Sequence, residues 1–155
     1  MVIATKLKSY LDEGEVNYHV LKHHQRFTSP EIAQALHVPG RMLAKVVIVT
    51  VGDRQMMAVL DANTQVDLHA FARAAGGTEA RLATEEELHA IFPDCEVGAM
   101  PPFGNLYDLP VFVDRALTKD KEIVFEAGNH REAIKLRYAD FERLVKPKVE
   151  DIGRR

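Results

Sequence analysis

Cysteine is almost absent from this sequence, since Cys95 is the only one among 155 residues. A single cysteine excludes an internal disulfide and a zinc site built from several cysteines, so we expect a reducing, cytoplasmic environment. Cys95 precedes an acidic residue and has no basic neighbour in the sequence. This setting favours a packing role over a nucleophilic one.

Long apolar runs and a large excess of one charge are lacking as well. No apolar run approaches the roughly 20 residues of a membrane-spanning helix, and the N-terminal stretch lacks the apolar core of a signal peptide, so we expect no membrane partner. The formal net charge of −3 argues against a protein that coats nucleic acid through a broad basic face. This charge does not exclude local contact with one end of an RNA.

Several catalytic motifs are missing. The sequence contains no HExxH zinc motif, no Walker A loop and no G-x-S-x-G elbow. His23 and His24 are adjacent, but neighbours on a strand point to opposite faces, and no second cluster completes a metal site. We therefore expect neither a metal nor another cofactor. A metal-dependent hydrolase that uses His23 or His24 is the least favoured alternative.

What is present is ordinary for a globular protein, with 46% hydrophobic and 28% charged residues, and we expect one domain over residues 1–155. Helical spacing, two capping boxes and β-branched runs predict the secondary structure. Helices are expected at 2–13, from 30 to about 38, at 68–74 (beginning after Asp67), at 84–91 and at 138–145. Strands are expected at 16–21 (with Val16, Tyr18 and Val20 on one face), 44–51, 55–61, 81–82, 111–113, 121–126 and 132–137.

Hairpins and helices are mixed in this order instead of alternating strictly. The fold class is therefore α+β, with a mixed, mostly antiparallel sheet or partial barrel and surrounding helices.

The least ordinary stretch is residues 96–114, EVGAMPPFGNLYDLPVFVD. It contains Gly98 and Gly104 on either side of the adjacent prolines Pro101 and Pro102. Glycine permits backbone geometry that other residues avoid, and proline fixes φ. The pattern suits a rigid bend whose backbone N–H groups face a ligand. A structural turn between two strands is the alternative reading of the same residues.

Two other residues stand out against their surroundings. Lys45 lies inside the most hydrophobic predicted strand, where an ammonium must reach a carboxylate, a ligand or solvent. It would bind phosphate or carboxylate as a point charge, or it is an edge lysine that reaches solvent. His130 lies in the Gly128–His130 turn before the last predicted strand. It is either a hydrogen-bonding group that acts near neutral pH or an ordinary turn histidine.

The strand lysine, the Gly98–Pro102 loop and the AGNH turn occur here in one order. Together they resemble the YbaK/ProX family of aminoacyl-tRNA deacylases, related to the editing domain inserted in bacterial prolyl-tRNA synthetase. The resemblance extends from the TSPEIAQAL helix to the DFERLV helix, and its most specific parts are Lys45 and the Gly-x-x-x-Pro loop. The Met100–Phe103 run departs from the commonest form of that loop.

The resemblance implies hydrolysis of the ester that joins a mischarged amino acid to the 3′-terminal adenosine of tRNA, without a side-chain nucleophile. It implies that Lys45 holds the terminal phosphate, and that amides of the loop, at Gly98 and Ala99, bind the aminoacyl carbonyl. His130 resembles a pocket histidine that helps to select the amino acid, and Asp114 closes the following strand with a role that is either structural or in binding. The predicted substrate-binding residues are Met100, Pro101, Pro102, Phe103, Gly104, Gly128, His130 and Asp114.

The predicted function is therefore a freestanding trans-editing deacylase for a small amino acid, because Met100, Phe103 and Met57 would narrow the pocket. The implied partner is the aminoacylated 3′ end of tRNA, with an aminoacyl-tRNA synthetase as a second candidate. The sequence does not indicate an oligomeric state. A non-catalytic module that binds a nucleotide, aminoacyl-tRNA or a synthetase surface would keep the same residues but show no turnover.

Overall fold

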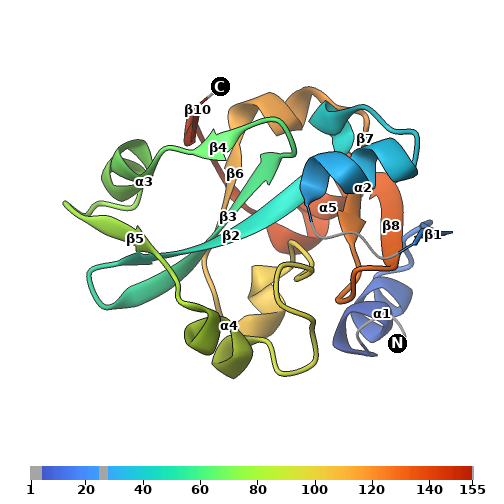
Figure 1. Cartoon of the computed structure of the whole chain (residues 1–155), viewed down its shortest axis with the longest axis horizontal. Helices are drawn as coiled ribbons and strands as arrows, with labels where there is room; N and C mark the ends of the chain where they lie inside the picture. Colours follow the sequence, from blue (N-terminus) through green and yellow to red (C-terminus); the bar gives the residue numbers. More distant parts are fainter. Residues whose placement is uncertain (1–4, 25–27, 155) are drawn as a thin grey trace.

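A long antiparallel hairpin crosses the centre of the fold, formed by β2 (Ala44–Val51) and β3 (Arg54–Asp61) (Figure 1). The computed structural model describes residues 5–24 and 28–154. The β-branched residues of β2 favour an extended backbone, and Gly52 at the turn adopts a φ of 64°. β5 (Ala80–Leu82) pairs antiparallel with β2, and β6 (Val111–Asp114) pairs parallel with β3. β9 (Lys148–Glu150) adds a parallel edge strand beside β6.

A second, antiparallel sheet has the strand order β1-β8-β7, with bounds His19–Lys22, Glu132–Arg137 and Glu122–Glu126. One parallel bridge, between Leu43 and Val124, joins it to the start of β2. β4 (Gln65–Val66) and β10 (Gly153–Arg154) form a separate two-stranded pair. The α+β class with mixed sheets is therefore confirmed, and among the described residues the strands do not close into a barrel.

Five α-helices surround these sheets in the described chain: α1 (Thr5–Glu13), α2 (Ser29–Ala35), α3 (Leu68–Ala74), α4 (Glu85–Ile91) and α5 (Tyr138–Val145). Both predicted capping boxes form, with Thr28 before α2 and Thr84 before α4 each exchanging hydrogen bonds with the glutamate three residues later. Three short 3-10 helices, η1 (Gly40–Met42), η2 (Gly104–Tyr107) and η3 (Arg115–Lys119), complete the connections. None of the helices in the described ranges has the length and apolar character needed to cross a membrane.

Three apolar clusters hold the elements together. The largest is centred on Phe103, whose ring contacts Phe125, Phe141 and Tyr10 at centroid distances of 5.5 to 6.1 Å. A second cluster lies under α3 and includes Phe71 and Phe112. A third lies under α2 and includes Leu43 and Val124, the two residues of the inter-sheet bridge.

The prediction was wrong at the N-terminal strand. Residues 16–18 lie outside β1, because Glu15 takes a φ of 54° and the Val16 N–H bonds back to the Leu11 carbonyl at the end of α1. Val16 is consequently buried, whereas Val20 is 41% exposed, so the two do not share a face.

Other boundaries also differ. α2 ends at Ala35 instead of near residue 38, since His37 adopts a left-handed φ of 57°. The predicted helix at 2–13 is present from Thr5, and residues 2–4 lie outside the described residues. No sequence pattern predicted β4, β9 or β10.

Candidate active site

The Gly98 loop turns back on itself through its own backbone. The Ala99 N–H donates to the Glu96 carbonyl at 3.0 Å, and Gly98 adopts a φ of 87°, a conformation that favours glycine. The Gly98 N–H contacts the Met100 thioether sulfur at 3.2 Å, and in the described chain it has no oxygen partner. Because a thioether is a weak acceptor, the Gly98 N–H is a donor in this loop that a substrate carbonyl can engage.

The Gly128–His130 turn holds this loop in place. The Gly128 N–H donates to the Ala99 carbonyl at 2.9 Å, and the Gly128 carbonyl accepts from the Glu96 N–H at 2.8 Å. The His130 N–H also donates to a Glu96 carboxylate oxygen at 3.3 Å. Thus the structure brings together the loop and the turn that the sequence singled out separately.

The His130 ring lies directly against Gly98. Its Nε2 is 2.8 Å from the Val97 carbonyl oxygen, and its Nδ1 is 3.2 Å from Glu126 Oε1. A Cβ at Gly98 would lie 3.4 Å from the ring carbon Cε1. The ring therefore packs against the loop in this structure, and each of its two nitrogens contacts an oxygen atom.

Glu126 at the end of β7 is a buried carboxyl group. Its side chain is 10% exposed and that of His130 is 4% exposed. Burial, and to a smaller extent the charge of Glu96, raise the pKa of Glu126 to about 7 against the opposing effect of His130. This group can therefore change protonation near neutral pH.

Lys45 occupies the second position of β2. Strand alternation puts its side chain on the same face as Leu43 and Val47, which belong to the clusters under α2 and α3 respectively. Burial lowers the pKa of Lys45, and the charge of Asp61 opposes that shift. Among the described residues no carboxylate lies within 4 Å of its ammonium. Lys45 is thus a half-buried cation available to an anionic ligand.

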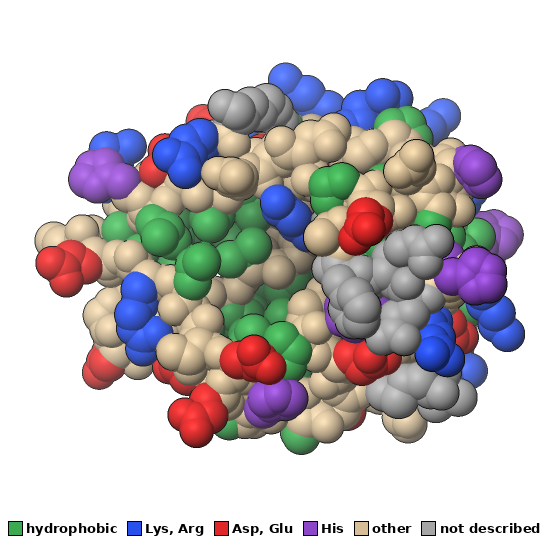
Figure 2. Space-filling model, viewed as in Figure 1, with side chains coloured by type: hydrophobic (Ala, Val, Ile, Leu, Met, Phe, Trp, Pro, Cys, Tyr) green, Lys and Arg blue, Asp and Glu red, His purple; other side chains and the backbone are tan. Residues whose placement is uncertain are grey.

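The inter-sheet bridge connects the strand of Lys45 to the strand of Glu126. Lys45 follows Leu43 by two residues, and Glu126 follows Val124 by two. Figure 2 shows a face of the molecule that is hollowed near its middle, with hydrophobic side chains on the floor and a basic side chain at the rim.

Solvent exposure divides the predicted site residues into two groups. Gly98 is exposed and Lys45 is half-buried, so these two can contact a ligand directly. The other predicted residues are buried: Ala99, Met100, Pro101, Pro102, Phe103, Gly104, Asp114, Gly128 and His130. Their roles in substrate binding stay predictions.

The contacts of several buried residues are structural. Phe103 and Met57 are 0% exposed, so they support the site from the core and offer no surface to a ligand in this conformation. A Cβ at Gly104 would meet Val111 Cγ2 at 2.7 Å, which explains the glycine by packing. Asp114 Oδ1 accepts the backbone N–H groups of Ile152 and Gly153 at 3.1 and 3.0 Å, which ties down the C-terminal segment.

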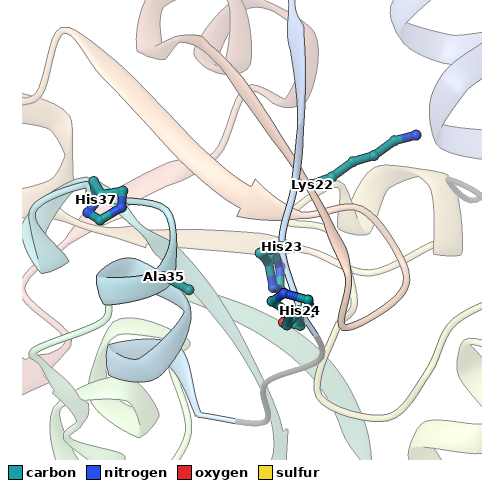
Figure 3. Close-up of a pocket in the computed structure, with 5 residues that line it drawn as sticks. All are labelled: Lys22, His23, His24, Ala35 and His37. Carbon is teal, nitrogen blue, oxygen red and sulfur yellow. Dashed lines mark hydrogen bonds between the residues drawn. The ribbon is translucent and has the colours of Figure 1, made fainter.

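Histidines gather elsewhere, around a pocket of about 560 Å³ between β1 and α2 (Figure 3). His23 and His24 lie at the end of β1, His37 lies across the pocket after α2, and the Lys22 side chain points away from them. In the described ranges no three histidine, cysteine or acidic side chains are placed to share a metal ion. We therefore locate the candidate site by its chemistry, at Lys45 and the Gly98 loop, and not at this pocket.

Sequence reasoning missed Glu126, Glu96 and the Val97 carbonyl. One signal was available, because Glu126 ends the apolar KEIVFE run four residues before His130. A carboxyl group at the end of a buried strand needs a partner, and His130 is that partner.

Comparison with known proteins finds relatives over most of the chain. Residues 23–144 match the family model of the aminoacyl-tRNA editing domain. The multifunctional Ser/Thr-tRNA deacylase ProXp-y of Escherichia coli (strain K12) is 32% identical over 103 residues, 66% of this chain and 61% of that protein. The proline–tRNA ligase of Thiobacillus denitrificans is 28% identical over 102 residues, 65% of this chain and 18% of the ligase. The chain thus matches only part of each relative's length.

Solved structures share the fold. The crystal structure of a candidate trans-editing enzyme for prolyl-tRNA synthetase superposes with a TM-score of 0.84 at 21% identity, covering 98% of this chain and 97% of that one. A hypothetical protein superposes with a TM-score of 0.86 at 19% identity, covering 96% and 99% of the two chains. At such low identity, these similarities establish the fold alone.

Proposed function

This chain belongs to the aminoacyl-tRNA editing domain family, and we propose that it is a freestanding deacylase that hydrolyses the ester of a mischarged aminoacyl-tRNA. One observation carries the proposal: of the residues predicted for catalysis and binding, the two with accessible surface are a half-buried cation, Lys45, and a backbone donor, Gly98. These are the two groups that an aminoacylated 3′ end requires. Its phosphate needs a positive charge, and its ester carbonyl needs a hydrogen-bond donor.

The chemistry follows from these two groups. The Gly98 N–H donates to the ester carbonyl oxygen and stabilises the negative charge that develops there when water attacks the carbonyl carbon. The ester C–O bond then breaks, the ribose oxygen takes a proton, and the products are the free amino acid and tRNA. Lys45 binds the terminal phosphate and fixes the ester against the loop. A free hydroxyl of the terminal ribose positions the water in this scheme, as a hypothesis.

The proposed substrate carries a small amino acid, and the proposed site lies in one domain over residues 1–155 of a cytoplasmic protein. The name of the ProXp-y relative, a Ser/Thr-tRNA deacylase, supports this substrate class. The match to a proline–tRNA ligase supports an aminoacyl-tRNA synthetase as a further partner. The formal charge of −3 predicts weak intrinsic affinity for tRNA, so a synthetase complex would help to deliver it.

The first test is deacylation of tRNAs charged with labelled Ala, Ser, Thr, Cys or Pro, by the wild type and by Lys45→Ala. We expect hydrolysis of one or a few of these substrates, and a loss of roughly 100-fold in kcat/KM for Lys45→Ala, because hydrogen bonds to charged groups contribute up to ~3 kcal/mol. Lys148→Ala is the matched control, since it removes the same charge from an exposed position on β9 of the same sheet.

Equal thermal unfolding of the three proteins shows that the fold is kept. Near-normal turnover by Lys45→Ala would overturn the assignment of Lys45. Absence of hydrolysis across the whole panel by folded wild-type protein would instead favour the non-catalytic binding module.

A further inference from the structure

The hydrogen bonds of His130 fix where its protons lie. The Val97 carbonyl oxygen can only accept, so the ring nitrogen 2.8 Å away, Nε2, must carry a hydrogen. The other ring nitrogen, Nδ1, lies 3.2 Å from Glu126 Oε1. A neutral imidazole has only one N–H, and in this arrangement Val97 already uses it.

A second proton must therefore lie between Nδ1 and Glu126. Either a protonated Glu126 donates to a neutral His130, or an imidazolium donates to a Glu126 carboxylate. The pair has no net charge in both arrangements, which suits its burial. Without that proton, a nitrogen lone pair would face a carboxylate, and one of the two hydrogen bonds of His130 would have to break.

Among the charged groups around the pair, Glu96 favours keeping the proton. Glu96 comes from the loop and faces the pair, accepting from the His130 N–H. Arg131 and Glu132 follow in the same turn, and the Glu132 carboxylate accepts from the Asn129 side chain. Lys45, on β2, carries a positive charge that interacts with Asp61. Burial and Glu96 both raise the pKa of Glu126, to about 7.

We propose that Glu126 is a positioning residue for the deacylation proposed above. The proton it shares with His130 keeps the ring bonded to the Val97 carbonyl and packed against Gly98, which presents the Gly98 N–H to the ester. Loss of the proton frees His130 from Val97 or from Glu126 and releases the loop. Glu126 acts through His130 and does not touch the substrate.

Two substitutions separate the proton from the packing. Glu126→Gln offers an amide N–H₂ that donates to an unprotonated Nδ1 without a titrating proton, so it should hold the His130 ring against Val97 and keep most of the wild-type kcat. Glu126→Leu fills similar space without a donor and should lower kcat by roughly 10- to 100-fold, as expected for a slightly misplaced catalytic group, with little change in KM.

The pH profile gives the sharper prediction. After subtraction of uncatalysed ester hydrolysis, wild-type kcat should fall as pH rises through the range where the pair loses its proton, whereas kcat of Glu126→Gln should not show that fall. An unchanged alkaline fall in Glu126→Gln would overturn the proposal. So would a Glu126→Gln enzyme as weak as Glu126→Leu.

A spectroscopic readout does not depend on activity. Long-range ¹H–¹⁵N spectra of the imidazoles, with His130 assigned by a His130→Gln variant, should show a protonated Nε2 in the wild type. In Glu126→Gln, Nε2 should stay protonated up to high pH. A wild-type His130 protonated at Nδ1 alone would contradict the proposed hydrogen bond from Nε2 to the Val97 carbonyl. If these spectra behave as expected but the wild type hydrolyses no charged tRNA, the proposed function fails. The proton-dependent positioning of His130 by Glu126 would still hold.

Discussion

The thiol of Cys95 lies in surroundings that disfavour its thiolate. Its Sγ is 3.6 Å from both the Asp94 carboxylate and the Tyr107 hydroxyl. Burial, the main cause, together with the neighbouring Asp94 charge raises the pKa of this thiol to about 12. The interpretation of Cys95 as a packing residue agrees with this environment.

Cys95 should consequently be unreactive in the folded protein. At pH 8 we expect its reaction with a thiol reagent such as Ellman's reagent to be roughly 1,000-fold slower than in the urea-unfolded chain, because the thiolate fraction falls tenfold per unit of pKa. Cys95→Ser should deacylate at the wild-type rate. Rapid labelling of the folded protein, or loss of activity in the serine variant, would show that the thiol is exposed or used.

Single residues were predictable where they break a local pattern. Lys45 interrupts an apolar strand, and Gly98 stands in a Gly/Pro cluster, so the sequence alone marks both. Glu126 was missed because its significance depends on a ring four residues away and on Val97, which is 33 positions from that ring in the chain. Contacts between distant positions leave no periodic trace in one sequence.

Among the elements, the C-terminal segment depends on one carboxylate. Asp114, the last residue of β6, accepts two backbone N–H groups from Ile152 and Gly153 with a single oxygen. Gly153 lies so close that an added Cβ would be 3.2 Å from Asp114 Cγ. This junction positions β10 beside β4, and it gives Asp114 a structural role whether or not it also contacts the substrate.

Asp114→Ala should lower the free energy of unfolding by about 2–3 kcal/mol, since it leaves two buried donors without their charged acceptor. Asp114→Asn keeps an oxygen at that position and should cost less. Urea unfolding measures both, and hydrogen exchange should accelerate at the Ile152 and Gly153 amides. Asp151→Ala, which removes an exposed carboxylate of the same segment, should change stability by less than about 1 kcal/mol. A similar effect of Asp151→Ala and Asp114→Ala would contradict the special role of Asp114.

Elements with local signals were predicted well. The capping boxes indicated α4 and the start of α2, and the apolar face of 138–145 matched α5 residue for residue. β9 and β10 were missed because they are short and exist through pairing with β6 and β4, far away in sequence. Their residues have no distinctive local propensity, so tertiary pairing decides their structure.

For the whole molecule, the charge distribution limits how tRNA can bind. The net charge is −3, and the proposed phosphate contact is made by one lysine, Lys45. We expect log Kd for tRNA to rise with log salt concentration with a slope of only about 0.7, since each phosphate contacted on a single strand contributes about 0.7 and one lysine makes the contact. Lys45→Ala should reduce the slope by about 0.7. A slope of about 5 or more, measured by fluorescence anisotropy, would indicate a broad basic interface instead.

The Leu43–Val124 bridge and the Val97–His130 contact also set an order of events during synthesis of the chain. Translation delivers the central hairpin and the Gly98 loop first, and β7 with the following turn after them. A nascent chain that stops before residue 124 carries Lys45 and the loop, but it lacks the Leu43–Val124 bridge and the contact of His130 with Val97. The protein therefore acquires its proposed activity only once the histidine at position 130 has left the ribosome.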